Sequence, residues 1–176
     1  MNDIAIIGAG AAGLTAAIFA ASKAQGKQII LFDSRLKIGA KILISGGTRC
    51  NVTHAQVLPT DYQGGAQHFI KHVLEAFPPS QTMEFFQRIG VPLILEPTGK
   101  YFPVTYSGRT VLEALIKETT RLGVKLITGV RIVGIKKEEG GFQLAAENQQ
   151  FFAKRGISAV AFFLIWTNKQ QPLLQS

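Results

Sequence analysis

The chain has 176 residues, 47% of them hydrophobic, which is enough to bury one substantial core and predicts a single globular domain or a domain with a fragment of another. The formal net charge of +8 comes from 19 basic and 11 acidic residues scattered along the chain, a pattern that disfavours a nucleic-acid-binding surface. The single cysteine excludes an internal disulfide and any zinc site built from several cysteines, and we expect a cytoplasmic protein.

The N-terminal segment has the pattern of a dinucleotide-binding βαβ unit. An apolar run at 4–7 predicts a buried strand, and Gly8, Gly10 and Gly13 follow it with G-x-G-x-x-G spacing. Gly8 permits a tight turn, Gly10 lets a pyrophosphate approach the backbone, and Gly13 allows a helix to pack closely on the strand. We therefore expect phosphates at the helix N-terminus, where unpaired N–H groups favour an anion.

A helix and a second strand complete this unit. Apolar residues at 14, 17, 18 and 21 have helical spacing, and 28–32 reads as a strand that ends at Asp33. Asp33 follows Gly13 at the separation along the sequence that is typical of the acid whose carboxylate accepts hydrogen bonds from the adenosine ribose. Arg35 leaves open a site for a 2′-phosphate. A signal peptide or membrane helix is disfavoured, because Asp3 replaces the usual positive start and glycines interrupt the apolar run.

Residues 39–54 form a predicted loop with unusual chemistry. Lys41 and Arg49 are cations near the expected phosphates, and Ser45 and two glycines offer a hydroxyl and bare backbone N–H groups. Cys50 follows, and we expect it as a small buried hydrophobe rather than a redox thiol, because no partner cysteine exists.

This loop resembles the K-x-L-x-S-G-G-G-R-C-N-x-T-N signature of the BaiN-type or aminoacetone-oxidase-like flavoproteins, which are bacterial NAD(P)/FAD-dependent oxidoreductases. The resemblance implies FAD in a Rossmann-like domain, a second domain inserted over the flavin, and NAD(P)H as a possible electron donor. It assigns no catalytic acid or base and no metal, and it leaves the small-molecule substrate and the oligomeric state open. The implied cofactor-binding residues are Gly8, Gly10, Ala11, Ala12, Gly13, Asp33, Ser34, Lys41, Ser45, Gly47, Arg49, Cys50, Asn51 and Ile132.

Two positions depart from the signature. Thr48 stands where the family has a third glycine, and His54 stands where it has asparagine. A β-branched threonine resists positive φ, so we expect strain at Thr48 if the glycine is left-handed in the family.

His68 and His72 have the i, i+4 spacing of a helical metal-binding pair. Neither the glutamate of a zincin motif nor a third ligand is placed by the sequence. The same predicted helix has apolar residues at 69, 70, 73, 74 and 77, so we expect both histidines on its solvent side and no metal site.

The middle of the chain alternates helical and extended patterns. A second helix is predicted at 82–88 before Gly90, extended pieces at 93–96 and 101–104, and a helix from Ser107 or Thr110 to Leu122. Residues 99–104 resemble the G-R-x-F-P motif of the same family, and about 60–105 are expected to belong to the inserted region. Strands are predicted at 124–127, 131–136, 142–146 and 150–153, and by resemblance the backbone at 130–132 contacts the adenine.

The predicted fold is α/β, a Rossmann-like FAD-binding domain with a parallel sheet, crossover helices and a β-meander. We expect this domain to be incomplete and to carry part of an inserted helical region. The resemblance covers about 1–153, whereas 154–176 diverges from the family and includes an apolar stretch at 157–166 that is too short to span a membrane. We therefore expect the N-terminal portion of an FAD-dependent oxidoreductase, truncated or frameshifted. Two alternatives stay open, an inactive remnant or non-catalytic nucleotide-binding module, and the NAD(P)-binding domain of a dehydrogenase.

Overall fold

The computed structural model describes residues 2–63 and 65–159, which divide into two compact units. One unit combines the described residues up to Lys41 with those from Leu115 onward, and the other consists of the described residues of Ile42–Ala114. The chain passes between them within α2 (Ala40–Ile44) and α5 (Gly108–Arg121). Along the stretches described, no helix is long and apolar enough to cross a membrane.

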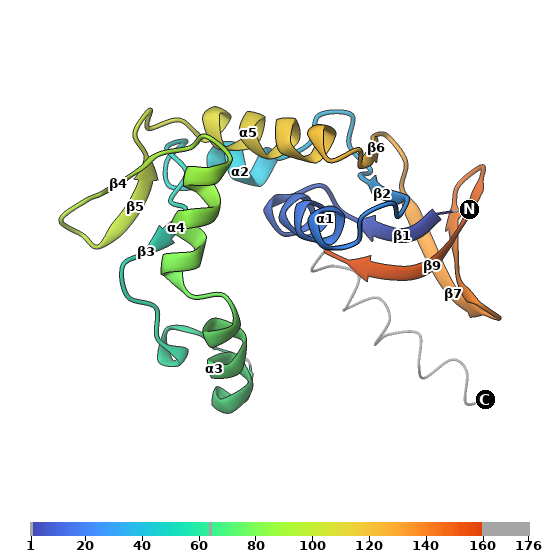
Figure 1. Ribbon diagram of the computed structural model, residues 1–176, viewed down its shortest axis with the longest axis horizontal. Helices are drawn as coiled ribbons and strands as arrows, with labels where there is room; N and C mark the ends of the chain where they lie inside the picture. The colour runs from blue at the N-terminus through green and yellow to red at the C-terminus, as the bar shows by residue number, and fades with distance from the viewer. Residues whose placement is uncertain (1, 64, 160–176) are drawn as a thin grey trace. The chain divides into compact units, whose positions relative to one another are not determined.

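The first unit contains a six-stranded sheet with the order β6-β2-β1-β9-β8-β7 (Figure 1). Strands β6, β2, β1 and β9 are parallel, whereas β9, β8 and β7 form an antiparallel meander. Helix α1 (Ala11–Lys23) connects β1 to β2. The α/β Rossmann-like fold with a parallel sheet and a meander is thus confirmed. The strands are β1 (Asn2–Ile7), β2 (Ile29–Phe32), β6 (Lys125–Ile127), β7 (Ile132–Glu138), β8 (Gly141–Ala146) and β9 (Gln150–Ser158).

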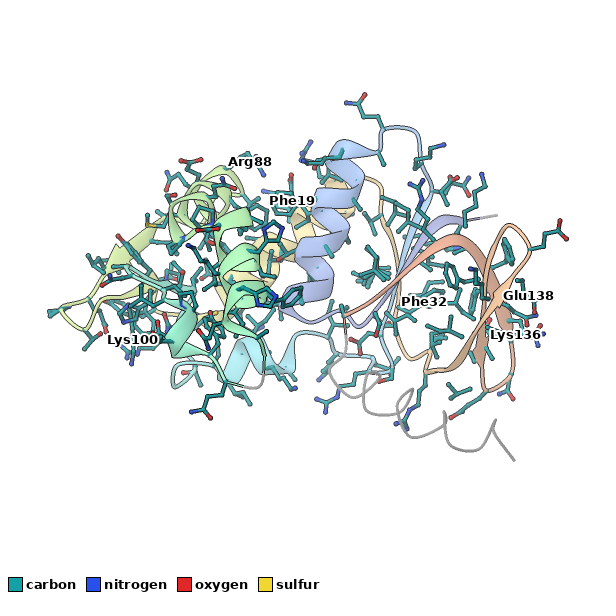
Figure 2. The ribbon with its side chains drawn as sticks, turned by 90° about the horizontal axis from the view of Figure 1, so that it is seen from below. Phe19, Phe32, Arg88, Lys100, Lys136 and Glu138 are labelled. Atoms are coloured by element: carbon teal, nitrogen blue, oxygen red, sulfur yellow. The ribbon has the colours of Figure 1, made fainter. Side chains whose placement is uncertain are left out.

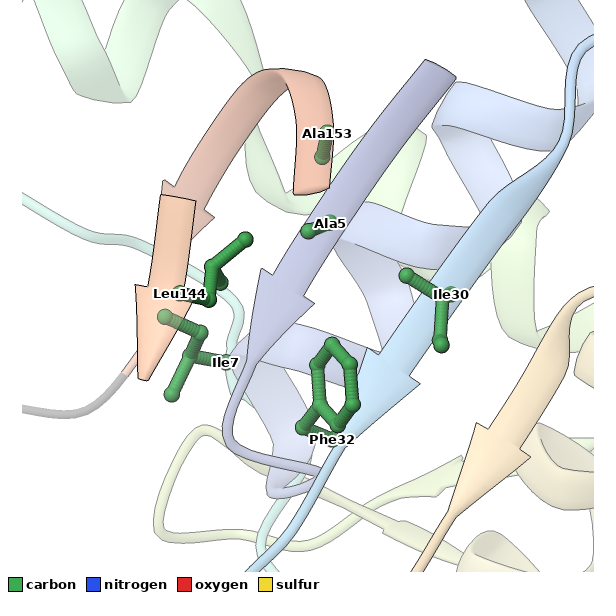
Figure 3. Packing of buried hydrophobic residues seen from close by; sticks show 6 residues of the cluster. All are labelled: Ala5, Ile7, Ile30, Phe32, Leu144 and Ala153. Atoms are coloured by element: carbon green, nitrogen blue, oxygen red, sulfur yellow. The ribbon is translucent and has the colours of Figure 1, made fainter. Parts of the chain in front are cut away.

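The core of this unit lies on and between the central strands (Figure 3). Every residue of β2 is buried, which is typical of a parallel strand covered on both faces. Phe32 lies within the sheet (Figure 2), and its ring centroid is 4.6 Å from that of Phe151. Helix α1 buries Leu14, Ala17 and Ile18, three members of the predicted apolar stripe. The core cluster consists of Ala5, Ile7, Ile30, Phe32, Leu144 and Ala153.

Strand β9 is longer than the sequence predicts. The expected strand ends at Ala153, but β9 continues to Ser158 and joins two parts of the sheet. Its first half pairs with β8, and its second half runs parallel to β1 with Ile7 opposite Ser158. Residues 154–158 are mostly exposed and lack the apolar alternation of a half-buried strand, so backbone pairing alone reveals them. The rest of the apolar stretch predicted at 157–166 lies outside the described residues from 160 onward.

Besides parts of α2 and α5, the second unit contains helices α3 and α4 and a small antiparallel sheet. Helices α3 (Gln67–Ala76) and α4 (Pro79–Arg88) confirm the two predicted helices, and α4 starts earlier because Pro79 suits the first helical turn. The sheet has the order β3-β5-β4. Its strands are β3 (Thr53–His54), β5 (Lys100–Pro103) and β4 (Leu93–Leu95), and a 3-10 turn η1 (Pro59–Asp61) precedes α3.

Asp3 of β1 contacts Lys154 of β9 and Gln28, the residue before β2, and the stability of the protein should therefore depend on the protonation of Asp3. Its carboxylate accepts hydrogen bonds from the Gln28 N–H at 3.0 Å and the Lys154 Nζ at 3.0 Å, and these contacts hold the pKa of Asp3 below the ordinary value of an aspartate. A depressed pKa in the folded state stabilises the protein above the unfolded pKa, and this contribution disappears as the pH falls through the folded pKa. We expect the free energy of unfolding of Asp3→Asn to fall less steeply than that of the wild type as the pH decreases below about 4. Urea unfolding midpoints at neutral and acidic pH measure this change, and equal pH dependence in both proteins would contradict it.

Candidate functional site

The three glycines after β1 have the geometries that the sequence predicts. Gly8 has φ +99°, and its N–H donates to the Phe32 carbonyl at 2.7 Å. Gly10 precedes the helix, and a Cβ at this position would meet no atom within 4 Å. A Cβ on Gly13 would lie 1.7 Å from the Gly8 carbonyl oxygen. Gly13 therefore permits the close packing of helix and loop, while Gly10 leaves open space beside the backbone.

The N-terminus of α1 is suited to an anion. The helix begins at Ala11, and its first turn contains no acidic residue. Leu14 is the first residue whose N–H reaches back to the Gly10 carbonyl, at 3.0 Å. The N–H groups of Ala11, Ala12 and Gly13 precede this first bond, so the helix itself supplies no acceptor for them. These donors and the positive end of the helix dipole can bind phosphate without a basic side chain.

Asp33 lies at the end of β2 beside the glycine loop. Its Oδ2 accepts the Ala9 N–H at 2.7 Å, and its Oδ1 accepts the Arg35 N–H at 2.8 Å. Each carboxylate oxygen can accept a further hydrogen bond, so a ribose hydroxyl remains an available partner. The sequence predicts the ribose contact but not the two backbone contacts, because the Ala9 contact depends on how β1 and β2 pair.

A pocket of about 370 Å³ adjoins the end of β2. Ser34 and Val130 line it, and the Val130 N–H donates to the Asp33 carbonyl at 3.0 Å. Ile132, whose backbone the family resemblance places at the adenine, begins β7, and its side chain packs against the hydrophobic core outside the lining of this pocket. Its cofactor contact stays a prediction. The pocket also includes Gly129, Arg131, Ala146, Glu147, Asn148 and Gln149.

The predicted loop at 39–54 is partly helical. Residues Ala40–Ile44 form α2, so the prediction of a loop is wrong for these five residues. Five residues are too few to show a helical period in the sequence. A left-handed turn follows, in which Gly46, Gly47 and Thr48 have φ values of +55°, +65° and +72°. The Cys50 N–H donates to the Ser45 carbonyl at 3.0 Å and closes the turn.

Thr48 carries the strain that the missing glycine predicts. A left-handed conformation costs an L-residue about 1–2 kcal/mol, and glycine avoids this cost. Glycine loses more conformational entropy on folding, which offsets part of the stabilisation. We therefore expect Thr48→Gly to raise the free energy of unfolding by about 0.5–1 kcal/mol. Chemical denaturation measures this difference. Thr98→Gly, at an exposed residue without positive φ, serves as the control and should not stabilise the protein; equal changes in both variants would refute the role of strain.

Arg49 is engaged within the second unit. Its Nη1 lies 2.6 Å from Glu96 Oε1, and its guanidinium carbon lies 4.2 Å from the centroid of the Phe102 ring. Tyr106 also faces this cation, at 5.8 Å. These contacts fix the position of the Arg49 side chain, and its cofactor role stays a prediction.

The other predicted residues of this segment differ in exposure. Cys50 is buried, as expected of a small hydrophobe, and Ser45 donates its hydroxyl to the Ile42 carbonyl at 2.9 Å. Lys41, Gly47 and Asn51 are exposed.

The histidines of α3 are exposed as predicted, but the predicted apolar side is not buried, since α3 contains no buried residue and Phe69 and Val73 are 63% and 51% exposed. Both His68 and His72 are exposed. Across residues 2–63 and 65–159, no group of three or more His, Cys, Asp or Glu side chains is arranged to hold a metal ion.

Sequence comparisons identify one matching family and several curated relatives. The model of the HI0933-like protein Rossmann domain matches residues 2–161. The chain is 39% identical over 160 residues to the 3-dehydro-bile acid delta(4,6)-reductase of Clostridium scindens, covering 90% of this chain and 39% of the relative. It is 32% identical over 142 residues to the ribosomal RNA dihydrouridine synthase of Escherichia coli, covering 81% and 35%. The chain therefore spans well under half the length of these relatives.

Solved structures share the fold at low sequence identity. The Thermovibrio ammonificans THI4 structure has a TM-score of 0.63 at 17% identity, over 97% of this chain and 62% of that chain. The 3-ketosteroid-delta4-(5alpha)-dehydrogenase of Rhodococcus jostii RHA1 has a TM-score of 0.63 at 14% identity, over 89% and 45%. These likenesses support the Rossmann-like architecture.

Proposed function

The chain belongs to the HI0933-like Rossmann family of FAD-binding oxidoreductases, and from this membership we propose that its first unit binds the adenosine diphosphate part of FAD. The observation that carries the proposal is the open space beside Gly10 at the start of α1, next to the Asp33 carboxylate. The protein residues present there fit a dinucleotide, because they provide N–H donors for the phosphates and an acceptor for the ribose.

Each part of the nucleotide has a counterpart in the first unit. The N–H groups of Ala11, Ala12 and Gly13 would hold the pyrophosphate, and the missing Cβ of Gly10 would let it approach. Asp33 would accept ribose hydroxyls while it keeps its bonds to the Ala9 and Arg35 N–H groups. The pocket beside Ser34 and Val130 would take the adenine.

We further propose that the reaction is the reduction of a carbon–carbon double bond conjugated to a carbonyl group. The names of two relatives, a bile acid delta(4,6)-reductase and a dihydrouridine synthase, both describe the saturation of such bonds. Bound FAD supplies two-electron chemistry, and NAD(P)H is the proposed donor of those electrons. The chain's own contribution is to bind and orient the nucleotide.

Competitive titration tests the nucleotide site. Purified protein freed of flavin is titrated with FAD, and ADP is then added as a competitor. ADP should displace FAD because both place the same phosphates and ribose on the first unit. FAD binding that ADP leaves unchanged would contradict the proposed site. Consumption of NAD(P)H by the FAD-loaded protein, with and without an enone, then tests the reaction separately.

A further inference from the structure

The pocket at the end of β2 is lined by three segments that the fold brings together. Ser34 follows β2, residues 129–131 lie between β6 and β7, and residues 146–149 contain the hairpin turn between β8 and β9. Asp33, the proposed ribose ligand, directly precedes Ser34, and its carbonyl accepts the Val130 N–H at 3.0 Å. A base attached to a ribose at Asp33 would therefore pass Ser34 and Val130 before it meets the β8–β9 turn.

The β8–β9 turn is held by hydrogen bonds across its base. The Ala146 N–H donates to the Gln149 carbonyl at 2.9 Å, and Gln143 Nε2 donates to Gln150 Oε1 at 2.9 Å between the two strands. Glu147 is one of the two residues enclosed by the first of these bonds. Its backbone is therefore fixed, and only its side chain must adjust to a ligand.

Two opposite charges line this pocket without pairing. Ile132 of β7 pairs with Ala146 of β8, so Arg131 and Glu147 are neighbours just beyond this pair. Both residues line the pocket and both are exposed. Within the described part of the chain, neither side chain takes part in a hydrogen bond or an ion pair. The pocket thus offers a guanidinium, which only donates, beside a carboxylate, which only accepts.

An adenine ring matches this pair of groups. Its 6-amino group donates hydrogen bonds, and the ring nitrogen N7 beside that group accepts one. Guanine and hypoxanthine have an oxygen acceptor in place of the amino group. That oxygen would lie beside a carboxylate that also only accepts, so neither would gain a hydrogen bond. A site whose polar groups are left unpaired by an analogue discriminates against it strongly.

We propose that Glu147 of the β8–β9 turn selects adenine at the nucleotide site by accepting a hydrogen bond from the 6-amino group, while Arg131 donates to an adjacent ring nitrogen. The inference rests on the proposed function, because it requires the ribose at Asp33 and the base in this pocket. It adds the residue that distinguishes adenine nucleotides from nucleotides with an oxygen at the 6 position.

The test is a calorimetric titration of the full chain, freed of flavin, with ADP and with inosine 5′-diphosphate. The two probes have the same ribose and phosphates, so the ratio of their affinities reports on the base alone. We expect ADP to bind about tenfold more tightly, which corresponds to one hydrogen bond formed with adenine and absent with hypoxanthine.

Three variants assign this preference to the turn. Glu147→Gln has an amide that can accept from an amino group or donate to an oxygen, so the preference should fall to about twofold or less. Arg131→Met should weaken the binding of both nucleotides, because both contain N7. Glu139→Gln is the matched control in the turn after β7, next to Glu138 at the other end of that strand (Figure 2), and should keep the wild-type preference.

Equal affinity of the wild type for the two nucleotides would overturn the proposal, and so would a preference that persists in Glu147→Gln. An equal loss of preference in Glu139→Gln would also overturn it, since the effect would then follow the net charge. In each of these cases ADP still binds, so the proposed nucleotide site stands. Absence of ADP binding would instead overturn both the site and the selection.

Discussion

Gly13→Ala should abolish FAD retention and lower the free energy of unfolding by about 2–3 kcal/mol, the cost of overpacking a closely packed site. The added methyl carbon would lie 1.7 Å from the Gly8 carbonyl oxygen, so α1 and the loop must separate. This separation displaces the N–H groups that we propose as phosphate ligands. Denaturation midpoints and flavin absorbance after gel filtration measure both effects.

Gly10→Ala separates binding from stability at the same loop. Gly10 has φ −83° and ψ −169°, an extended conformation that alanine adopts, and its Cβ would meet open space. We expect stability near that of the wild type but a marked loss of FAD affinity, because the methyl group would occupy the pyrophosphate's position. Gly156→Ala, also unobstructed but in β9, is the control and should retain FAD. Retention of FAD by Gly13→Ala, or equal affinity of Gly10→Ala and Gly156→Ala, would refute these roles.

Asp33→Ala should weaken FAD binding about 10- to 100-fold and also destabilise the chain by about 1–3 kcal/mol. The loss of affinity reflects charge-assisted hydrogen bonds to the ribose. The loss of stability arises because the N–H of Ala9, a fully buried residue, would lose its carboxylate acceptor.

Two further variants distinguish these effects. Asp33→Asn keeps an oxygen acceptor for the Ala9 N–H and should recover much of the stability but less of the FAD affinity. Glu113→Ala, which removes an exposed carboxylate, should change neither. Fluorescence titration with FAD and urea unfolding provide the two measurements, and unchanged FAD affinity in Asp33→Ala would exclude the ribose role.

The βαβ unit is predictable from sequence because several local signals agree there. The apolar strand, the glycine spacing before α1 and the acid after β2 each impose their own conformational or chemical requirement. All of these elements form in the structure as predicted. The strain at Thr48 is expected only through the family resemblance, because threonine stands where the signature has a glycine that can be left-handed, and the structure gives Thr48 a φ of +72°.

Features that depend on distant contacts are not predictable in this way. The extension of β9 depends on pairing with β1, about 150 residues earlier, because its own side chains are mostly exposed. The Arg49 contact with Glu96 joins residues 47 positions apart. The burial of His54 Nδ1 without a hydrogen-bond partner in the described structure likewise follows from packing against Gly99, which no sequence pattern records.

The most direct test of the central claim is the visible absorbance spectrum of the purified chain, recorded after incubation with FAD and removal of the excess. Binding at the α1 N-terminus predicts a flavin band that the wild type and Gly156→Ala retain with equal intensity and that Gly13→Ala loses. A wild-type chain that folds but retains no flavin would contradict the assignment of the first unit as an FAD-binding site.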